Sequence, residues 1–374
     1  MKDRSIKNIR RLILAIFLIF ISYRAYMHQV LGGGTEGSPS IHALCPYGGL
    51  ESFYTLLSSG TFIQKIFSGT FVLFALTIIL AIIFRRSFCG ILCPFGALQE
   101  FLGMIGQKLF GKRFVMPKRI DQPMRYLKYI VLLITTIGAW VTAEMWMAPY
   151  DPWSAYGHIF GEVEETFVEA PIGIGLLMIT IVGSILYDRF FCKYLCPMGA
   201  FLSIVSKVSP YKIERNEEKC IDCGICSKKC PVNIEVAKEK VITTAECINC
   251  QTCVLSCPKE GALEVKHGKK ILTPLIVIIA VIGIYFGGVF AANIMGIYEV
   301  LPAPIPVGQI MDSEELKGYM ALEEVSKYMD ISMDELYTKL DLPKNIPHNT
   351  KLKEIKNYVE DFEVSVAREI LKNR

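Results

Sequence analysis

The chain has 374 residues, of which 52% are hydrophobic and 20% are charged, and its formal net charge is +4. A mean hydropathy of +0.38 is too high for a soluble globular protein of this length, so the composition indicates an integral membrane protein in contact with lipid. The small positive charge gives no support for a nucleic-acid partner, and we expect none.

Five apolar segments are long enough, or nearly so, to cross a hydrocarbon core as helices of about 20 residues. The alternative, buried helices of a large soluble domain, is weak because the last segment runs its whole length without a charged residue. The sequence therefore predicts about five transmembrane helices, near residues 11–30, 66–84, 126–146, 170–187 and 271–294.

Lys and Arg are distributed unevenly among the connections between these segments. The N-terminal tail and residues 85–125 are rich in both, whereas residues 31–64 and 147–169 contain neither. Because positively charged loops stay in the cytoplasm, we expect a cytoplasmic N-terminus, and five crossings then place the C-terminus outside. No convincing cleavage site follows the first segment, so it is predicted to be an uncleaved helix of a multi-pass protein of the cell membrane.

Twelve of the thirteen cysteines fall into paired or fourfold motifs. The strongest motif, Cys-x2-Cys-x2-Cys-x3-Cys-Pro, occurs at 220–231 and again at 247–258. This spacing is typical of bacterial two-cluster ferredoxins, in which the fourth cysteine of each run binds the other cluster. The spacing predicts one [4Fe-4S] cluster on Cys220, Cys223, Cys226 and Cys257, and a second on Cys247, Cys250, Cys253 and Cys230, so these residues are the expected iron ligands.

Zinc and disulfide bonds explain these eight cysteines less well. Structural zinc usually takes two cysteine pairs separated by a longer loop, and the predicted topology places this segment in the reducing cytoplasm. Residues 212–267 resemble a ferredoxin domain throughout, including apolar flanks at 211–213 and 263–265 that are typical of strands.

A second cysteine pair also occurs twice. The segments FCGILCPFGAL and FCKYLCPMGAF share the pattern Phe-Cys-x3-Cys-Pro-x-Gly-Ala, and each follows a segment that we expect to run from outside to inside. All four thiols are therefore expected at the cytoplasmic membrane boundary, where a third iron–sulfur cluster is one hypothesis. Two redox-active dithiols, a copper or zinc site, and cysteines that only pack as small apolar side chains stay open as alternatives. The four residues are Cys89, Cys93, Cys192 and Cys196.

Cys45 belongs to a third, degenerate copy of this motif, CPYGG. The predicted topology places it on the outer side, so we expect it to lie apart from the other four thiols. A free thiol, an intermolecular disulfide, a contact to a partner's cofactor and a buried structural cysteine are the alternatives for this residue.

With these motifs together, residues 1–295 resemble the membrane polyferredoxins of the NapH, NosR and MauN type. The resemblance implies electron transfer between a quinol pool or a cytoplasmic donor and a partner redox enzyme or its maturation system. It implies two [4Fe-4S] clusters as cofactors and leaves open a third cluster and a quinone. The chain has no large N-terminal flavin-binding domain of the kind found in NosR, so a covalent flavin is not expected.

The expected fold is a mainly α membrane protein with an inserted two-[4Fe-4S] ferredoxin-like α+β domain and a small C-terminal helical module. In that module, Ser332-x-x-Glu335 predicts the start of one helix, and Asn349 or Thr350 the start of a last helix that ends near Lys372. The predicted domains are 1–211 (membrane), 212–267 (cytoplasmic, ferredoxin-like), 268–295 (fifth transmembrane helix) and 296–374 (extracytoplasmic).

Three functions fit the sequence. The first is a membrane-anchored electron-transfer protein without catalytic residues of its own, which counts as an enzyme only if quinol is oxidised on it. The second is a redox accessory protein for the maturation of a metalloenzyme, and the third is a cluster-based redox sensor. Only five histidines occur and none lies centrally in an apolar segment, so an intramembrane haem is not expected.

Overall fold

The computed structural model describes residues 2–34, 37–60, 62–63, 66–160, 167, 170–302, 313, 316, 318, 320–359 and 362–372. The chain forms two compact units. Unit 1 comprises Met1–Gln29 and Pro39–Val300, and unit 2 comprises Val30–Ser38 and Leu301–Arg374. The described part is mostly helical with one small antiparallel sheet, in agreement with the predicted fold class.

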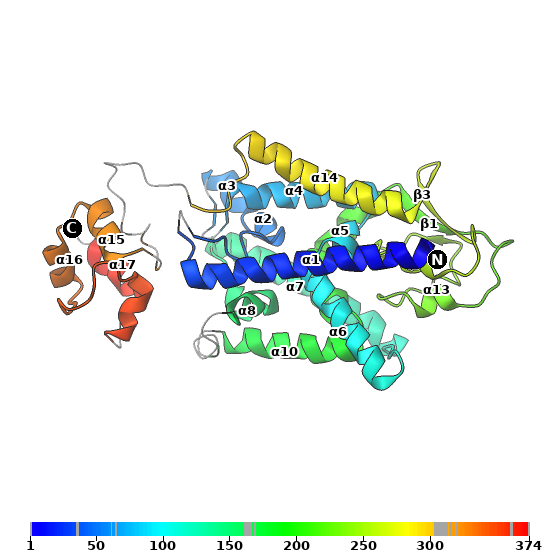
Figure 1. Cartoon of the computed structure of the whole chain (residues 1–374), viewed down its shortest axis with the longest axis horizontal. Coiled ribbons are helices and arrows are strands. Elements are labelled where there is room, and N and C mark those ends of the chain that lie inside the picture. Colours follow the sequence, from blue (N-terminus) through cyan, green and yellow to red (C-terminus); the bar gives the residue numbers. More distant parts are fainter. Residues whose placement is uncertain are drawn as a thin grey trace. The chain divides into compact units, whose positions relative to one another are not determined.

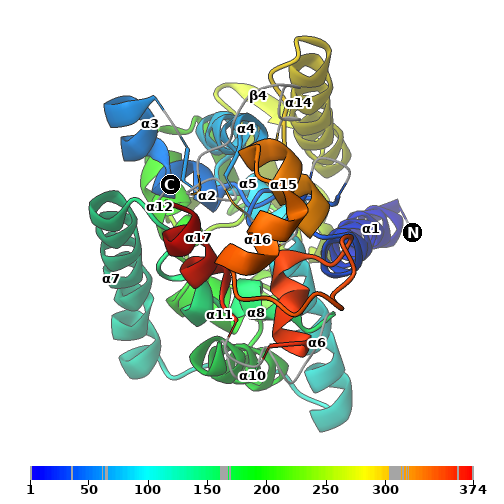
Figure 2. The same cartoon turned by 90° about the vertical axis from the view of Figure 1, so that its left-hand side faces the viewer.

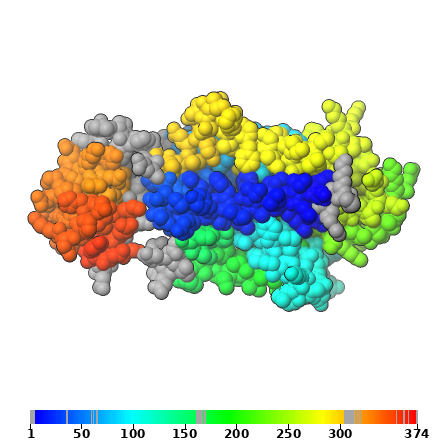
Figure 3. Space-filling view, viewed as in Figure 1, coloured from blue at the N-terminus to red at the C-terminus, as the bar shows by residue number. Residues whose placement is uncertain are grey.

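Each of the five predicted apolar segments overlaps one helix of the described structure. In Figure 1, α1, α4, α10 and α14 run roughly parallel to one another, and the view in Figure 2 shows α5 inside the ring that α1, α7, α10 and α14 form. Figure 3 shows α1 along one face of unit 1, between α14 and α6. The five helices are α1 (Lys2–Leu31), α4 (Ser68–Phe84), α7 (Lys118–Thr142), α10 (Pro171–Leu186) and α14 (Pro274–Ile294).

Among the residues that the structure describes, α7 and α14 are long and apolar enough to cross a membrane, judged by length and composition. α4 and α10 are apolar but shorter, with 17 and 16 residues. The count of five transmembrane helices and the domain boundaries within unit 1 stay predictions.

The two Cys-x3-Cys-Pro motifs have the same local structure. In each, the first cysteine lies on a short helix, and the second is the N-cap of the next helix, whose first residue is the proline. Proline is favoured at this position because its missing N–H would have no partner within the helix. The first repeat is α4, α5 (Ser87–Ile91) and α6 (Pro94–Phe110), and the second is α10, α11 (Phe190–Tyr194) and α12 (Pro197–Val205), followed by η2 (Ser206–Val208).

Three short helices lie at the end of unit 1 opposite to the sheet, as Figure 1 shows: α2 (Tyr47–Glu51), α3 (Phe53–Ser59) and α8 (Pro152–His158). A short 3-10 helix, η1 (Ala148–Tyr150), directly precedes α8 in the chain. The sheet lies instead at the end near the N-terminus of the chain, as Figure 1 shows.

The sheet contains the two strands that the sequence predicted. β1 (Tyr211–Arg215) and β3 (Leu263–His267) pair antiparallel, with Ile213 opposite Val265. β2 (Val241–Ile242) and β4 (Lys270–Leu272) complete the order β2-β1-β3-β4. The cysteine runs lie between β1 and β3 and include α13 (Ile225–Lys228) and η3 (Val254–Ser256). The sheet thus packs against both cysteine runs.

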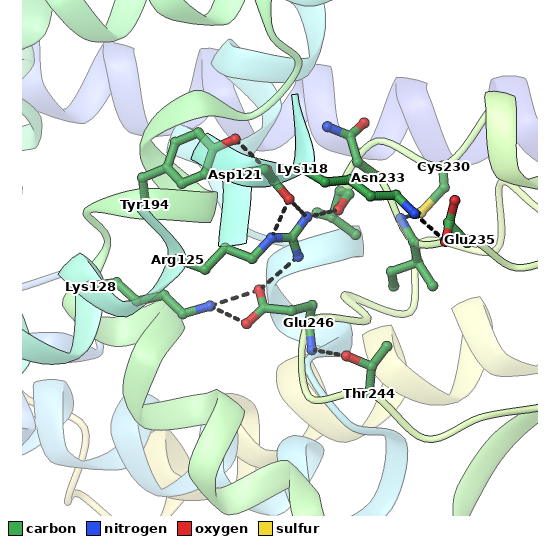
Figure 4. A network of polar contacts seen from close by, with 12 residues as sticks. Lys118, Asp121, Arg125, Lys128, Tyr194, Cys230, Asn233, Glu235, Thr244 and Glu246 are labelled. Atoms are coloured by element: carbon green, nitrogen blue, oxygen red, sulfur yellow. Dashed lines mark hydrogen bonds and ion pairs between the residues drawn. The ribbon is translucent and has the colours of Figure 1, made fainter. Parts of the chain in front are cut away.

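Buried ion pairs hold the ferredoxin-like part against α7 (Figure 4). Lys128, whose side chain is fully buried, lies 2.5 Å from one carboxylate oxygen of Glu246, the residue before Cys247. Arg125 contacts the same carboxylate at 3.7 Å and pairs with Asp121 at 2.7 Å. These contacts fix the Cys247 loop relative to α7.

Unit 2 is a small helical module built around its own apolar core. As predicted, Ser332 is the N-cap of one helix, and its hydroxyl accepts a hydrogen bond from the Glu335 amide. The prediction of one continuous last helix was wrong, because the chain forms η5 and then α17 after a break. A straight helix from 350 to 372 would be about 33 Å long, too long for its apolar residues to pack in one small core. The elements are α15 (Leu322–Met329), α16 (Met333–Lys339), η5 (Leu352–Asn357) and α17 (Val364–Lys372).

We expect the variant Glu246→Gln to lower the free energy of unfolding by about 3 kcal/mol, because it leaves the buried ammonium of Lys128 without a carboxylate. Lys118→Gln is the control: its pair with Glu235 is largely exposed, so the loss should be about 0–1 kcal/mol. Thermal unfolding of the protein in detergent measures both. Equal effects of the two variants would contradict the role of the buried pair.

Candidate iron–sulfur centres

The first predicted ligand set surrounds a hollow beside β1 and β3. All four cysteines of that set line it, although they come from two different runs: Cys220, Cys223, Cys226 and Cys257. The hollow encloses about 360 Å³, part of it open to solvent, and is also lined by apolar residues such as Leu263. The crossing of the fourth cysteine from one run to the other is the arrangement expected of a two-cluster ferredoxin.

The second predicted ligand set surrounds a hollow of similar size, about 350 Å³. Its lining is more apolar and includes Ile213, Val236 and Ile242. The Cys230 sulfur accepts a hydrogen bond from the Ile234 amide at 3.4 Å, and such bonds to sulfur raise the reduction potential of a cluster. The four cysteines that line it are Cys230, Cys247, Cys250 and Cys253.

The residues present fit two cubane clusters, because the four cysteines of each set line a hollow and do not converge on the position of a single metal ion. Within the described ranges, no group of three or more His, Cys, Asp or Glu side chains is arranged to hold a single metal ion. The ligand assignments themselves stay predictions.

The two hollows differ in their access to solvent. Cys223 of the first hollow is exposed, and its neighbour Ile221 is 55% exposed. In the second hollow, Cys230, Cys250 and Cys253 are all buried. A soluble redox partner can therefore approach the first hollow more closely than the second.

The four thiols of the repeated Cys-x3-Cys-Pro motifs lie together inside unit 1. Cys93 and Cys196 pack against the same apolar cluster, and Gln99 of the first repeat donates to the Cys192 sulfur. Cys89, Cys93 and Cys192 all act electrostatically on Cys196. We call Cys89, Cys93, Cys192 and Cys196 the four-thiol centre.

Both repeats donate hydrogen bonds to the sulfur atoms of the four-thiol centre. The Gly96 amide donates to the Cys93 sulfur at 3.4 Å, and the Gly199 amide donates to the Cys196 sulfur at 3.2 Å. The side-chain amide of Gln99 adds a bond of 3.2 Å to the Cys192 sulfur. Donors aimed at sulfur stabilise thiolates, the form in which cysteine binds metals.

The four-thiol centre is in direct backbone contact with the second hollow. A Cβ atom placed on Gly90, which follows Cys89, would lie 2.2 Å from the Ile248 carbonyl oxygen and 3.0 Å from the Cys250 amide nitrogen. Glycine alone allows this approach. The backbone of the first repeat at Gly90 therefore touches the backbone at Cys250, a predicted ligand of the second cluster.

Buried charged residues that the sequence analysis did not single out surround the four-thiol centre. Glu100 on α6 pairs with Arg10 of α1 and, at 2.7 Å, with Arg189 of the second repeat. Burial alone would raise the pKa of Glu100, but the two guanidinium charges lower it to about 2, so this carboxylate is ionised. A signal was present in the sequence, because an arginine precedes the first cysteine by three residues in both motifs, as Arg86 and Arg189.

Cys45 does not lie apart from the other thiols, as the predicted topology had implied. It packs against the same apolar cluster as Cys93 and Cys196, because the segment around Ile41 and Tyr47 is buried within unit 1. Burial raises the pKa of the Cys45 thiol to about 12, so this thiol stays protonated. The side chain is partly buried and packed among apolar residues, and of the alternatives this agrees best with a structural cysteine.

Comparisons with known proteins agree with this geometry. The profile of a family described as "4Fe-4S binding domain" matches residues 69–113 and again 169–216, which are the two repeats of the four-thiol centre. A second profile, described as "4Fe-4S dicluster domain", matches residues 212–258. No solved structure matches the chain.

Several curated proteins are similar in sequence. The "Putative electron transport protein YccM" of Escherichia coli is 31% identical over 73% of this chain and 76% of its own length. The "Regulatory protein NosR" of Pseudomonas aeruginosa is 27% identical over 52% of this chain and 28% of its own length. The "Ferredoxin-type protein NapH" of Escherichia coli is 21% identical over 50% of this chain and 63% of its own length.

The two family profiles and these relatives agree with the two hollows that the ferredoxin cysteines line. Together they define an iron–sulfur protein of electron transport. The chain belongs to the family of membrane-associated, polyferredoxin-type proteins with 4Fe-4S binding domains, as its motifs had indicated.

We expect Gly90→Ala to destabilise the protein by about 2 kcal/mol, because the added methyl group must push the Ile248–Cys250 backbone away. Gly175→Ala is the matched control, since nothing lies within 4 Å of the added Cβ there. Thermal unfolding in detergent and the iron content of each variant are the measurements. An unchanged Gly90→Ala protein would show that the two backbones are not in contact.

Proposed function

We propose that the chain relays electrons across three iron–sulfur centres, from a donor at the first hollow through the second hollow to the four-thiol centre. The observation that supports this order most directly is the contact of Gly90 with Cys250, which brings the second hollow and the four-thiol centre together. From there the electrons pass to the quinone pool or to a partner redox enzyme.

The exposure of the cysteines supports the first hollow as the place where a soluble partner meets the chain. The first hollow has an exposed cysteine, the second hollow is largely buried, and the four-thiol centre has buried cysteines on both repeats, Cys89 and Cys192. A centre at the surface exchanges electrons with soluble partners, whereas a buried centre exchanges them with its neighbours.

The membrane arrangement that goes with this proposal has five transmembrane helices, α1, α4, α7, α10 and α14. The ferredoxin-like part lies at the same end of unit 1 as the N-terminus of α1 (Figure 1), and the Lys and Arg distribution favours the cytoplasm for both. A cytoplasmic donor would then meet the first hollow. The C-terminal module would lie outside and dock a partner.

We expect about twelve iron atoms, with a similar amount of acid-labile sulfide, per chain purified without oxygen, because three cubanes hold four irons each. Electron paramagnetic resonance during a reductive titration should resolve three centres. Replacing Cys93 and Cys196 by Ser should reduce the iron to about eight and remove one signal.

The matched control is Cys45→Ser, because Cys45 is partly buried against the same apolar cluster as Cys93 and Cys196 but belongs to no predicted ligand set. It should keep the full iron content. About eight irons in the unmodified chain would contradict the relay through the four-thiol centre and leave two clusters only.

A further inference from the structure

Two buried arginines cross between the repeats at the four-thiol centre. Arg189 of the second repeat donates to the Cys89 carbonyl oxygen of the first repeat at 2.6 Å. Its guanidinium also lies against Gly96, where an added Cβ would be 2.7 Å from it. Arg86 of the first repeat lies in the same way against Gly199 of the second, at 2.8 Å.

The crossing places each guanidinium beside the turn in which the glycine amide donates to a cysteine sulfur. Arg86 interacts electrostatically with Cys89, Cys192 and Cys196. Arg189 acts on Cys192 and Cys93, and also on Cys250 of the second hollow. Arg86 also acts on Cys247 of that hollow. The two positive charges therefore reach all four thiols, and each reaches thiols of both repeats.

Neither arginine is fully neutralised by the protein. Glu100 is shared by Arg10 and Arg189, so that trio keeps one net positive charge. Glu246 is shared by three cations, Arg86, Arg125 and Lys128, and of these Arg125 also pairs with Asp121. Three cations and two carboxylates again leave one net positive charge.

Buried positive charge without a counter-charge is costly, so these networks require an anion nearby. Both arginines are almost fully buried, at 1% and 0% exposure, and their Nε atoms have no hydrogen-bond partner in the described structure. Four neutral thiols, or two disulfides, would provide no negative charge. An oxidised iron–sulfur cluster with four thiolates is dianionic, because the thiolates outweigh the doubly positive core. Both arginines interact more strongly with thiols of this centre than with Cys247 or Cys250 of the second hollow, so a cluster on the four thiols is the anion that would compensate them most directly.

We propose that Arg86 and Arg189 are positioning residues that neutralise a dianionic iron–sulfur cluster at the four-thiol centre and raise its reduction potential. This inference rests on the proposed function, since it requires that cluster. The step concerned is a one-electron reduction, in which the cluster accepts an electron from the second hollow and becomes more negative. The buried positive charges stabilise the reduced form more than the oxidised form.

The test replaces each arginine in the full-length protein, purified without oxygen, by Gln and by Lys. Titration with dithionite, followed by electron paramagnetic resonance, gives the potential of each centre. We expect Arg86→Gln and Arg189→Gln each to lower the ratio of reduced to oxidised four-thiol centre about tenfold at a fixed potential, a shift of about 59 mV to more negative values. The Lys variants keep the charge and should keep most of the potential.

Arg85→Gln is the matched control. Arg85 is also buried and adjacent in sequence, but it donates to the carbonyl oxygens of Ile242 and Thr243 in the ferredoxin-like part. It should leave the potential of the four-thiol centre unchanged. If the Gln variants lose about four irons while the Lys variants keep them, the charge is required for assembly, which also supports the proposal.

An intact four-thiol centre with an unchanged potential in both Gln variants would overturn the inference and leave the relay standing. Equal effects of Lys and Gln would also overturn it, because the geometry and not the charge would then matter. About eight irons and two signals in the unmodified protein would instead overturn the proposed function, and the inference with it.

Discussion

The close approach of two backbones at Gly90 and Cys250 is the constraint on which the arrangement of unit 1 depends. A separate ferredoxin-like domain on a linker would have no fixed distance to the helices. Here the contact is maintained from several sides, by the Asn249 side-chain amide, which donates to the Phe84 carbonyl oxygen at 2.7 Å, and by the ion pairs of Glu246 with α7. Because these groups are buried, water does not screen them, and the Cys247 loop is held in one position.

The parts of this structure that could be predicted from the sequence are those in which the chemistry is local. The spacing of the ferredoxin cysteines predicts which of them share a cluster, and the same two groups of four line the two hollows. The helices, the paired strands and the Ser332 cap follow from apolar patterning and short-range hydrogen bonds. The two Cys-x3-Cys-Pro motifs could be found as a repeat, but their meeting depends on how helices far apart in the chain pack.

The buried ion pairs, the position of Cys45 and the break in the last helix could not be predicted, because each depends on packing between segments that are far apart in the chain. Glu100 and Glu246 are ordinary surface residues by type, and only the packing of α1, α7 and both repeats buries them beside cations from distant segments. The position of Cys45 beside the other thiols was missed because loop charge determines on which side of a membrane a connection lies but not how deeply it folds back. The break in the last helix reflects the size of the unit 2 core.

The two repeats are similar but not interchangeable, and only the first lies against the backbone of the ferredoxin-like part at Cys250. Where the first repeat has Gly90, open to the Cys250 backbone, the second has Lys193, buried and stacked over the Tyr194 ring at 5.2 Å. Each repeat supplies only two of the four thiols, so a chain with a single repeat would have to pair with a copy of itself to assemble the same centre. Such a symmetric dimer would offer two equivalent faces to the ferredoxin-like part. In a chain that contains two unequal repeats, only one face can contact the ferredoxin-like part.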